Sequence, residues 1–191
     1  MGNRGNDNFP TIETERIRLR AFRLEDTKNY FNYHNSADTT GFYDWKPETF
    51  EDAENDIKLI IRDYEKMKRI QWAISLKGDD TIIGDCGIMA EGLKGEVNYM
   101  LSREYWGKGI MTEALGGLIS FCFRQTDLIR IQALTNPDNE SSGRLLERIG
   151  FIREGLLRKY GFNTITGQPV DLNMWAILKS EFSNFIPYVL F

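Results

Sequence analysis

The sequence predicts an α/β fold in which a mixed sheet is flanked by helices. Segments that alternate apolar and polar residues, typical of half-buried strands, are interspersed with segments whose apolar residues recur at helical spacing. At 101–113 and 135–149 a strand pattern runs directly into a helix pattern, which is typical of folds that cover a sheet with helices.

Length and composition indicate one globular unit. The chain has 191 residues, of which 41% are hydrophobic, 27% charged and 13% aromatic. This is enough for one well-buried core, whereas two independent cores would be crowded. We expect a flexible lead-in at 1–10 and a single domain at 11–191.

The expected elements of the first half are a strand at 16–22, a helix at 24–35, a helix opening after Thr49, and strands at 70–76, 81–89 and 96–101. The strand at 16–22 alternates apolar residues with arginines. Thr49 and Asp52 resemble a capping box, which begins a helix. The turn signal at 78–80 separates two strand patterns and therefore indicates an antiparallel hairpin.

The expected elements of the second half are a helix after Gly109, a strand at 129–135, a helix at 138–150, and strands at 151–158 and 170–178. Gly150 is placed to end its helix as a left-handed residue. The apolar stretch at 184–191 is expected either to dock on the domain or to seal a dimer, so the chain is expected to be a monomer or a homodimer.

Charge and cysteine usage exclude several classes of protein. A net charge of −4 argues against a nucleic-acid partner, whose binding site is normally basic. No apolar run approaches the ~20 residues that span a membrane, and the first residues lack the apolar core of a signal peptide. Cys86 and Cys122 match no metal-ligand spacing and are expected to be buried thiols. We therefore expect a cytoplasmic protein without a metal site.

Gly107 and Gly109 stand where a helix is about to begin. A helix N-terminus binds anions through its unpaired N–H groups, and glycine lets the backbone come close to a phosphate. A Walker loop requires Ser or Thr where Gly109 stands, and a dinucleotide fingerprint requires glycine where Thr112 stands. The spacing alone leaves a phosphate loop and an ordinary tight turn both open.

Two longer motifs resemble a known family. "YMLSREYWGKGIMTEA" (99–114) resembles the acetyl-CoA loop of the GNAT N-acetyltransferases, most closely the Rim-type branch that acetylates N-termini of ribosomal proteins. "NPDNESSGRLLERIGF" (136–151) resembles the second signature of that branch. The likeness covers roughly residues 11 to 180. Glu104 departs from the pattern, since the family has Gln or Arg there, which puts a side-chain contact to phosphate in doubt.

The resemblance implies a GNAT-like, mostly antiparallel twisted sheet of about seven strands flanked by about four helices. It also implies acetyl-CoA as the cofactor. Met100 and Leu101 are expected to offer backbone groups to the pantetheine arm, and Asn139 to hydrogen-bond near it. The expected cofactor-binding residues of the loop are Trp106, Gly107, Lys108, Gly109, Ile110, Met111 and Thr112.

Acetyl transfer to an amine needs a neutral amine, donors for the developing oxyanion and a proton for the leaving thiolate. Glu96 begins the strand that leads to the loop and is the candidate base, acting through water or by holding the ammonium; the alternative is a solvated strand-edge glutamate. Ser142 shares a helix face with Leu146 and Ile149, so it points inward. The resemblance implies that Ser142 protonates the thiolate, and the alternative is a capping serine.

The resemblance implies that the acceptor is a primary amine, and early aromatic residues are candidate walls of its site. The expected substrate-binding residues are Tyr33, Phe42, Asp44 and Trp45, although such aromatics can equally be ordinary core. The leading hypothesis is direct acetyl transfer to a protein N-terminal α-amine. The alternatives are an N-acetyltransferase for a small molecule such as an antibiotic or polyamine, and a non-catalytic domain that binds acyl-CoA.

Overall fold

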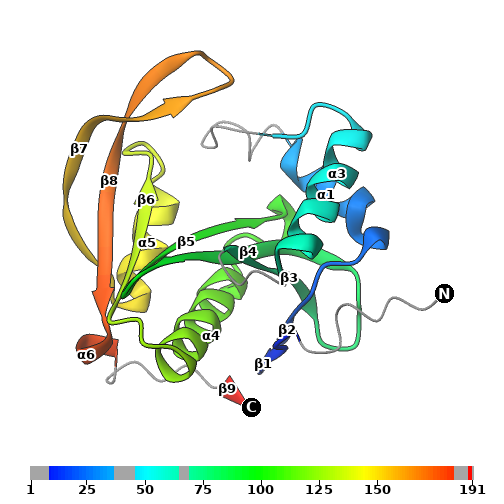
Figure 1. The fold of residues 1–191 in the computed structure, drawn as a ribbon, viewed down its shortest axis with the longest axis horizontal. Coiled ribbons are helices and arrows are strands. Elements are labelled where there is room, and N and C mark those ends of the chain that lie inside the picture. The colour runs from blue at the N-terminus through cyan, green and yellow to red at the C-terminus, as the bar shows by residue number, and fades with distance from the viewer. Residues whose placement is uncertain (1–8, 37–45, 65–68, 183–188, 191) are drawn as a thin grey trace.

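The computed structural model describes residues 9–36, 46–64, 69–182 and 189–190 (Figure 1). The elements in chain order are β1 (Ile12–Thr14), β2 (Ile17–Arg20), the 3-10 helix η1 (Leu24–Asp26), α1 (Thr27–His34), α3 (Phe50–Asp63), β3 (Arg69–Leu76), β4 (Ile82–Glu91), β5 (Lys94–Leu101), the 3-10 helix η3 (Arg103–Tyr105), α4 (Ile110–Gln125), β6 (Arg130–Thr135), α5 (Glu140–Ile149), β7 (Ile152–Asn163), β8 (Gln168–Leu178), α6 (Lys179–Phe182) and β9 (Val189–Leu190). Within these residues no helix combines the length and apolar character that crossing a bilayer requires.

The strands of the described residues form one sheet in the order β7-β8-β6-β5-β4-β3-β2-β1-β9. The β5–β6 pair is parallel and the other pairs are antiparallel. The predicted mixed, mostly antiparallel sheet is therefore confirmed. It is wider than expected because β1 and β9 add to one edge, where Val189 pairs with Thr14. The backbone of the C-terminal stretch thus docks on its own sheet at this point.

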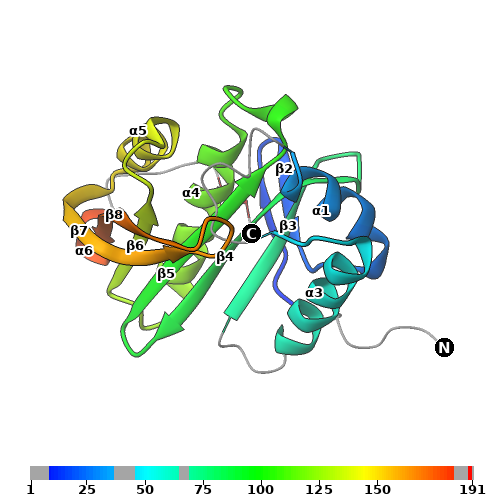
Figure 2. The ribbon, with the colours of Figure 1, turned by 90° about the horizontal axis from the view of Figure 1, so that it is seen from above.

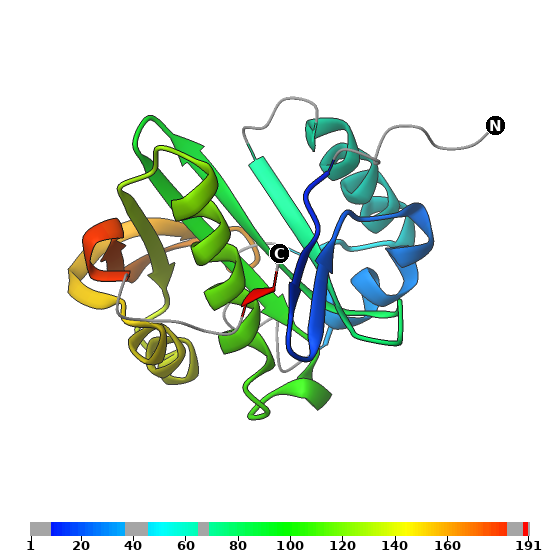
Figure 3. The same ribbon diagram turned by 90° about the horizontal axis from the view of Figure 1, so that it is seen from below.

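Helices cover both faces of the sheet. The helices α1 and α3 lie over one face, and α4 and α5 lie over the other (Figures 2 and 3). Each face has its own apolar core. The core under α4 includes Trp72 and Leu118, whereas the core under α1 and α3 includes Phe22 and Ile57. As expected, Cys86 and Cys122 are buried, free thiols.

Local sequence signals set the ends of the helices. The Thr49 hydroxyl accepts from the backbone N–H of Asp52, and the Asp52 carboxylate accepts in return from the N–H of Thr49, so the predicted capping box begins α3. Gly150 ends α5 with φ of +103°, the left-handed conformation that was predicted.

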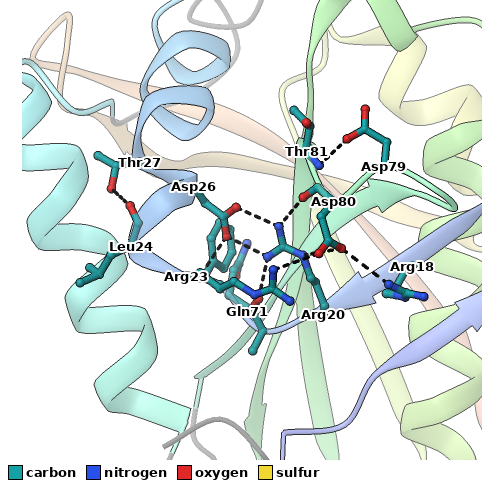
Figure 4. A network of polar contacts seen from close by, with 12 residues as sticks. Arg18, Arg20, Arg23, Leu24, Asp26, Thr27, Gln71, Asp79, Asp80 and Thr81 are labelled. Atoms are coloured by element: carbon teal, nitrogen blue, oxygen red, sulfur yellow. Dashed lines mark hydrogen bonds and ion pairs between the residues drawn. The ribbon is translucent and has the colours of Figure 1, made fainter. Parts of the chain in front are cut away.

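A polar cluster ties β2 to neighbouring segments (Figure 4). The buried Arg20 guanidinium forms two hydrogen bonds with the Asp26 carboxylate of η1, at 2.8 and 2.9 Å, and donates to the backbone oxygen of Asp80 in the β3–β4 turn. Arg23 forms a more exposed pair with the Asp80 carboxylate at 3.1 Å. These contacts join the end of β2 to η1 and to the β3–β4 turn.

Two features of the sheet create room for a site. The β5–β6 pairing covers Lys94–Glu96 against Arg130–Gln132, although both strands continue beyond these residues. The β7–β8 hairpin extends past the end of β6 and curves toward the side of α1 and α3 (Figure 1). Its register shifts between Leu157 and Gly161, where Lys159 has a positive φ of 52°. Such irregularities bend a strand.

Candidate active site

One cavity lies on the loop between β5 and α4. We call it the loop cavity; its volume is about 390 Å³. The described residues that line it are Tyr99, Met100, Leu101, Arg103, Tyr105, Trp106, Gly107, Gly109, Ile110, Met111, Thr112, Asn139, Ser141, Ser142, Arg144, Leu145 and Arg148. Nearly all residues predicted to bind the cofactor are thus brought to one cavity.

The loop has the geometry that an anion site at a helix N-terminus requires. Gly107 and Gly109 have φ of +72° and +75°, which non-glycine residues rarely adopt, and Gly109 caps α4. A Cβ on Gly107 would meet no atom of the described residues within 4 Å, so the backbone there is open to an approaching group. In the first turn of α4 the buried Thr112 hydroxyl has no hydrogen-bond partner among the residues that the structure describes. A phosphate fits this loop, since it accepts hydrogen bonds from N–H and O–H groups.

The charges of the loop cavity are all positive among its described residues. Arg103, Arg144 and Arg148 line it, and no carboxylate does. This is notable in a chain with 28 acidic and 24 basic residues. Arg103 also lies over the Trp106 ring, 4.6 Å from its centre. A polyanion such as a nucleotide diphosphate suits this lining.

A second cavity lies beside the first, against the β7–β8 hairpin. We call it the hairpin cavity; its volume is about 260 Å³. Its described lining residues are Glu96, Val97, Asn98, Tyr99, Leu134, Thr135, Asn136, Asn139, Ser142, Gly161, Phe162, Asn163, Val170 and Leu172. Glu96 is the one charged residue among them. The hairpin cavity therefore suits a cation with polar neighbours, in contrast to the loop cavity.

The two cavities meet at Tyr99, Asn139 and Ser142, which line both. The Ser142 hydroxyl is 2.5 Å from the Tyr99 hydroxyl, and either group can be the donor. Burial raises the pKa of Tyr99 to about 12, and its hydrogen bond with Ser142 opposes this rise. Tyr99 is therefore protonated at neutral pH and can supply a proton at this junction.

The start of α5 orients Ser142. The Asn139 side chain accepts from the backbone N–H of Ser142 at 3.1 Å and so caps the helix. Ser142 is 9% exposed and shares a buried face with Leu146 and Ile149, as predicted. The capping role falls to Asn139, which leaves the Ser142 hydroxyl for the contact with Tyr99.

Glu96 is held where the two parallel strands meet. Its partner across the β5–β6 ladder is Gln132, whose side-chain N–H donates to the Glu96 carboxylate at 2.9 Å. Arg130 donates to the Gln132 carbonyl at 3.4 Å and pairs with Glu154. A fixed carboxylate at the wall of the hairpin cavity can hold an ammonium group or accept its proton.

Several predicted residues lie elsewhere. Lys108 is not among the described residues that line the loop cavity, because its ammonium group lies over the Tyr105 ring, 5.4 Å from the centre. Tyr33 is a buried residue of α1 that donates to the Asp85 carboxylate at 2.7 Å, and it is not among the described residues that line either cavity. Phe42, Asp44 and Trp45 fall outside the described residues.

Sequence reasoning missed Tyr99 as a side chain of the site, and it missed the three arginines of the loop cavity. The strand pattern at 96–101 does place Tyr99 on the same face as Val97 and Leu101, the face that α5 approaches. The i, i+4 spacing of Arg144 and Arg148 places them together on α5. Neither pattern indicates which cavity these side chains line.

Comparisons with known proteins identify the family of this chain. Residues 16–152 match the acetyltransferase (GNAT) domain. The chain is 34% identical to an uncharacterized N-acetyltransferase, p20, of Bacillus licheniformis over 91% of this chain and 98% of that one. A 64-residue stretch, 34% of this chain and 33% of the other, is 39% identical to the [ribosomal protein uS5]-alanine N-acetyltransferase of Escherichia coli.

Among solved structures, a GNAT-family acetyltransferase from Bacillus anthracis superposes with a TM-score of 0.80 at 25% identity, covering 90% of this chain and all of that one. The fold, the family match over most of the chain and the full-length relative lead to one conclusion. The chain belongs to the GNAT family of acetyltransferases, enzymes whose acetyl donor is acetyl-CoA.

Proposed function

We propose that the enzyme binds acetyl-CoA in the loop cavity and transfers its acetyl group directly to a primary amine held in the hairpin cavity. The observation that carries this proposal is the charge pattern: a positive cavity and a cavity with one carboxylate share a wall at Tyr99, Asn139 and Ser142. The thioester supplies the activated acetyl group. A polyanion on one side and an ammonium on the other bring the reacting groups to that wall.

The amide groups of residues 107 to 112 hold the diphosphate, and the edge of β5 at Met100 and Leu101 holds the pantetheine arm. Glu96 binds the ammonium form of the acceptor and takes its proton, directly or through water. Ser142 delivers its proton to the departing sulfur and regains one from Tyr99, and the second proton that the amine nitrogen loses as the amide forms returns to Tyr99. No cysteine or serine is needed as a covalent carrier.

For the acceptor we propose the α-amine of a protein N-terminus, as in the Rim-type branch. The local similarity to the uS5-alanine acetyltransferase supports this. Asn98, Asn136 and Asn163 also line the hairpin cavity together with Glu96. Neutral amides that both donate and accept hydrogen bonds suit the peptide groups beside an N-terminus. A small-molecule amine is the second candidate, since about 260 Å³ holds only a residue-sized group.

A panel of acceptors tests the proposal by thiol release from acetyl-CoA. Peptides copying ribosomal N-termini, the same peptides with blocked N-termini and an internal lysine, an aminoglycoside and a polyamine are compared at equal concentration. We expect the highest kcat/KM for free N-terminal peptides. Selective turnover of the aminoglycoside or polyamine would establish the second candidate, and binding of acetyl-CoA with no turnover of any amine would refute both.

Glu96→Gln tests the role of the carboxylate, because it removes the negative charge and keeps nearly the same side-chain size. We expect kcat/KM for the acceptor to fall roughly 10²-fold because an uncharged amide neither attracts an ammonium nor accepts its proton. The dissociation constant of acetyl-CoA should change by less than about twofold, because Glu96 lines the hairpin cavity and not the loop cavity. Glu91→Gln, at the exposed end of the same β4–β5 hairpin, is the matched control. Equal activity of both variants would contradict the role of Glu96.

A further inference from the structure

The turn between β1 and β2 contacts the loop before α4 although neither cavity includes it. The Arg16 guanidinium donates to the backbone oxygen of Lys108 at 2.9 Å and to the Glu113 carboxylate at 2.6 Å. The Arg16 backbone N–H donates to the other Glu113 oxygen at 2.7 Å, and Thr14 donates to the same oxygen. A segment 97 residues earlier in the chain thus holds the loop. We call Thr14, Arg16 and Glu113 the loop clasp.

The first consequence of the loop clasp is the direction of one backbone N–H. The Lys108 carbonyl and the Gly109 N–H belong to the same peptide unit, and in a planar trans peptide they point in opposite directions. The described residues contain no cis peptide. When Arg16 holds the Lys108 oxygen, the Gly109 N–H points away from Arg16. Gly109 lines the loop cavity and Arg16 does not, so this N–H is available to a phosphate.

The second consequence concerns charge. Glu113 lies in the first turn of α4, close to where the diphosphate is proposed to bind. Burial raises the pKa of Glu113, but hydrogen bonds from Thr14 and Arg16 outweigh this, so the pKa lies below its ordinary value and the group is ionised at neutral pH. An unpaired carboxylate there would repel a polyanion. Arg16 pairs with Glu113 and removes most of that repulsion.

We propose that Arg16 is a positioning residue for the diphosphate of acetyl-CoA: it fixes the peptide between Lys108 and Gly109 and neutralises Glu113 from outside the cavity. The inference rests on the proposed function in that the diphosphate occupies the loop at 107–112. It predicts an effect confined to cofactors that carry phosphate groups.

S-acetylpantetheine tests this restriction because it carries the thioester and the pantetheine arm without the diphosphate. In Arg16→Met we expect acetyl-CoA to bind about tenfold more weakly, the effect of one lost charge-assisted hydrogen bond. The kcat/KM measured with S-acetylpantetheine should stay within about twofold. Arg18→Met is the matched control, since Arg18 lies two residues on and pairs with Glu13 instead. It should leave both values unchanged.

Two further variants keep the test informative. Arg16→Lys retains the charge but lacks the fork that reaches two acceptors, so it should bind acetyl-CoA with intermediate affinity and serves if Arg16→Met does not fold. Adding Glu113→Gln to Arg16→Met should recover part of the affinity, because it removes the carboxylate that the first change leaves unpaired.

The binding and activity measurements distinguish a failure of the proposed function from a failure of the role of Arg16. If the wild-type protein binds no acetyl-CoA by calorimetry, the proposed function fails. If it binds and the Arg16 variants bind equally well, only the role of Arg16 fails. If Arg16→Met lowers activity with S-acetylpantetheine as much as with acetyl-CoA, the residue supports the fold in general and the inference is likewise wrong.

Discussion

Ser142 and Tyr99 come from segments 43 residues apart, and their hydroxyl groups share a short hydrogen bond at the wall between the two cavities. The pair is enclosed: Ser142 is 9% exposed, and Tyr99 keeps its proton far above neutral pH because burial raises its pKa to about 12. A hydroxyl with a protonated neighbour can give up a proton and regain one. This is the property that a leaving thiolate requires.

Ser142→Ala removes the hydroxyl without changing the cap, because Asn139 bonds the backbone N–H of residue 142. We expect kcat to fall roughly 10²-fold, within the range for the loss of a positioned acid. The dissociation constant of acetyl-CoA should change little, which calorimetry measures. Ser141→Ala is the control, since its hydroxyl donates to Asn139 at 2.8 Å and not to Tyr99. Unchanged turnover of Ser142→Ala would remove its proposed role.

For single residues, the sequence predicts the direction in which a side chain points better than it predicts which residue that side chain contacts. The helical spacing with Leu146 and Ile149 predicts that Ser142 points inward, and it does. Its contact with Tyr99 depends on how α5 packs against β5. The same limit applies to Glu96, because Gln132 reaches it only through the parallel pairing of β5 with β6.

The loop between β5 and α4 combines two left-handed glycines with the N-terminus of a helix. Gly107 and Gly109 turn the chain so that consecutive amides follow a tight curve, as in other concave anion sites. A Cβ added to Gly107 would have no neighbour within 4 Å in the described part of the chain. A substitution of Gly107 would therefore lower stability through backbone strain, and it would weaken binding through a clash with a ligand in the loop cavity.

Comparing Gly107→Ala with Gly78→Ala distinguishes the effect of backbone strain from the effect on ligand binding. Gly78 lies in the β3–β4 turn with φ of +87°. A Cβ added there would likewise meet no atom of the described residues within 4 Å. Both changes should lower the free energy of unfolding by about 1 kcal/mol, since both force alanine into a left-handed conformation. Only Gly107→Ala should weaken acetyl-CoA binding, by roughly tenfold if one phosphate contact is lost. Equal affinities in calorimetry would contradict the phosphate loop.

Among the elements, long periodic segments were predicted well and short or irregular ones were not. The capping box of α3 and the left-handed end of α5 were confirmed because local chemistry determines them. The strands β1 and β9 have three and two residues, too few to show a period of two. The expected strand at 151–158 continues to Asn163 through an irregular register that only pairing with β8 reveals.

For the molecule as a whole, the net charge of −4 does not show that the two cavities differ in the sign of their charge. The described lining of the loop cavity is basic, and that of the hairpin cavity holds one carboxylate. Composition predicted neither, because it averages over the surface. The order of strand and helix patterns along the chain, in contrast, correctly predicted one sheet flanked by helices.

The stability of the whole chain depends on the buried pair of Arg20 and Asp26, whose side chains are 6% and 7% exposed. Arg20→Met leaves the Asp26 carboxylate buried without its main counter-charge. We expect the free energy of unfolding in urea to fall by roughly 3–5 kcal/mol. Arg23→Met, which breaks only the exposed pair with Asp80, should change it by less than about 0.5 kcal/mol. Similar midpoints for both variants would refute this assignment.

The wall that the two cavities share has a kinetic consequence. Only Tyr99, Asn139 and Ser142 belong to both described linings, so a molecule in one cavity leaves most of the other's surface untouched. If the two cavities hold donor and acceptor as proposed, both can be bound at the same time, in whichever order they arrive. Such an arrangement favours a ternary complex over a ping-pong scheme, in which the first product must leave before the second substrate enters.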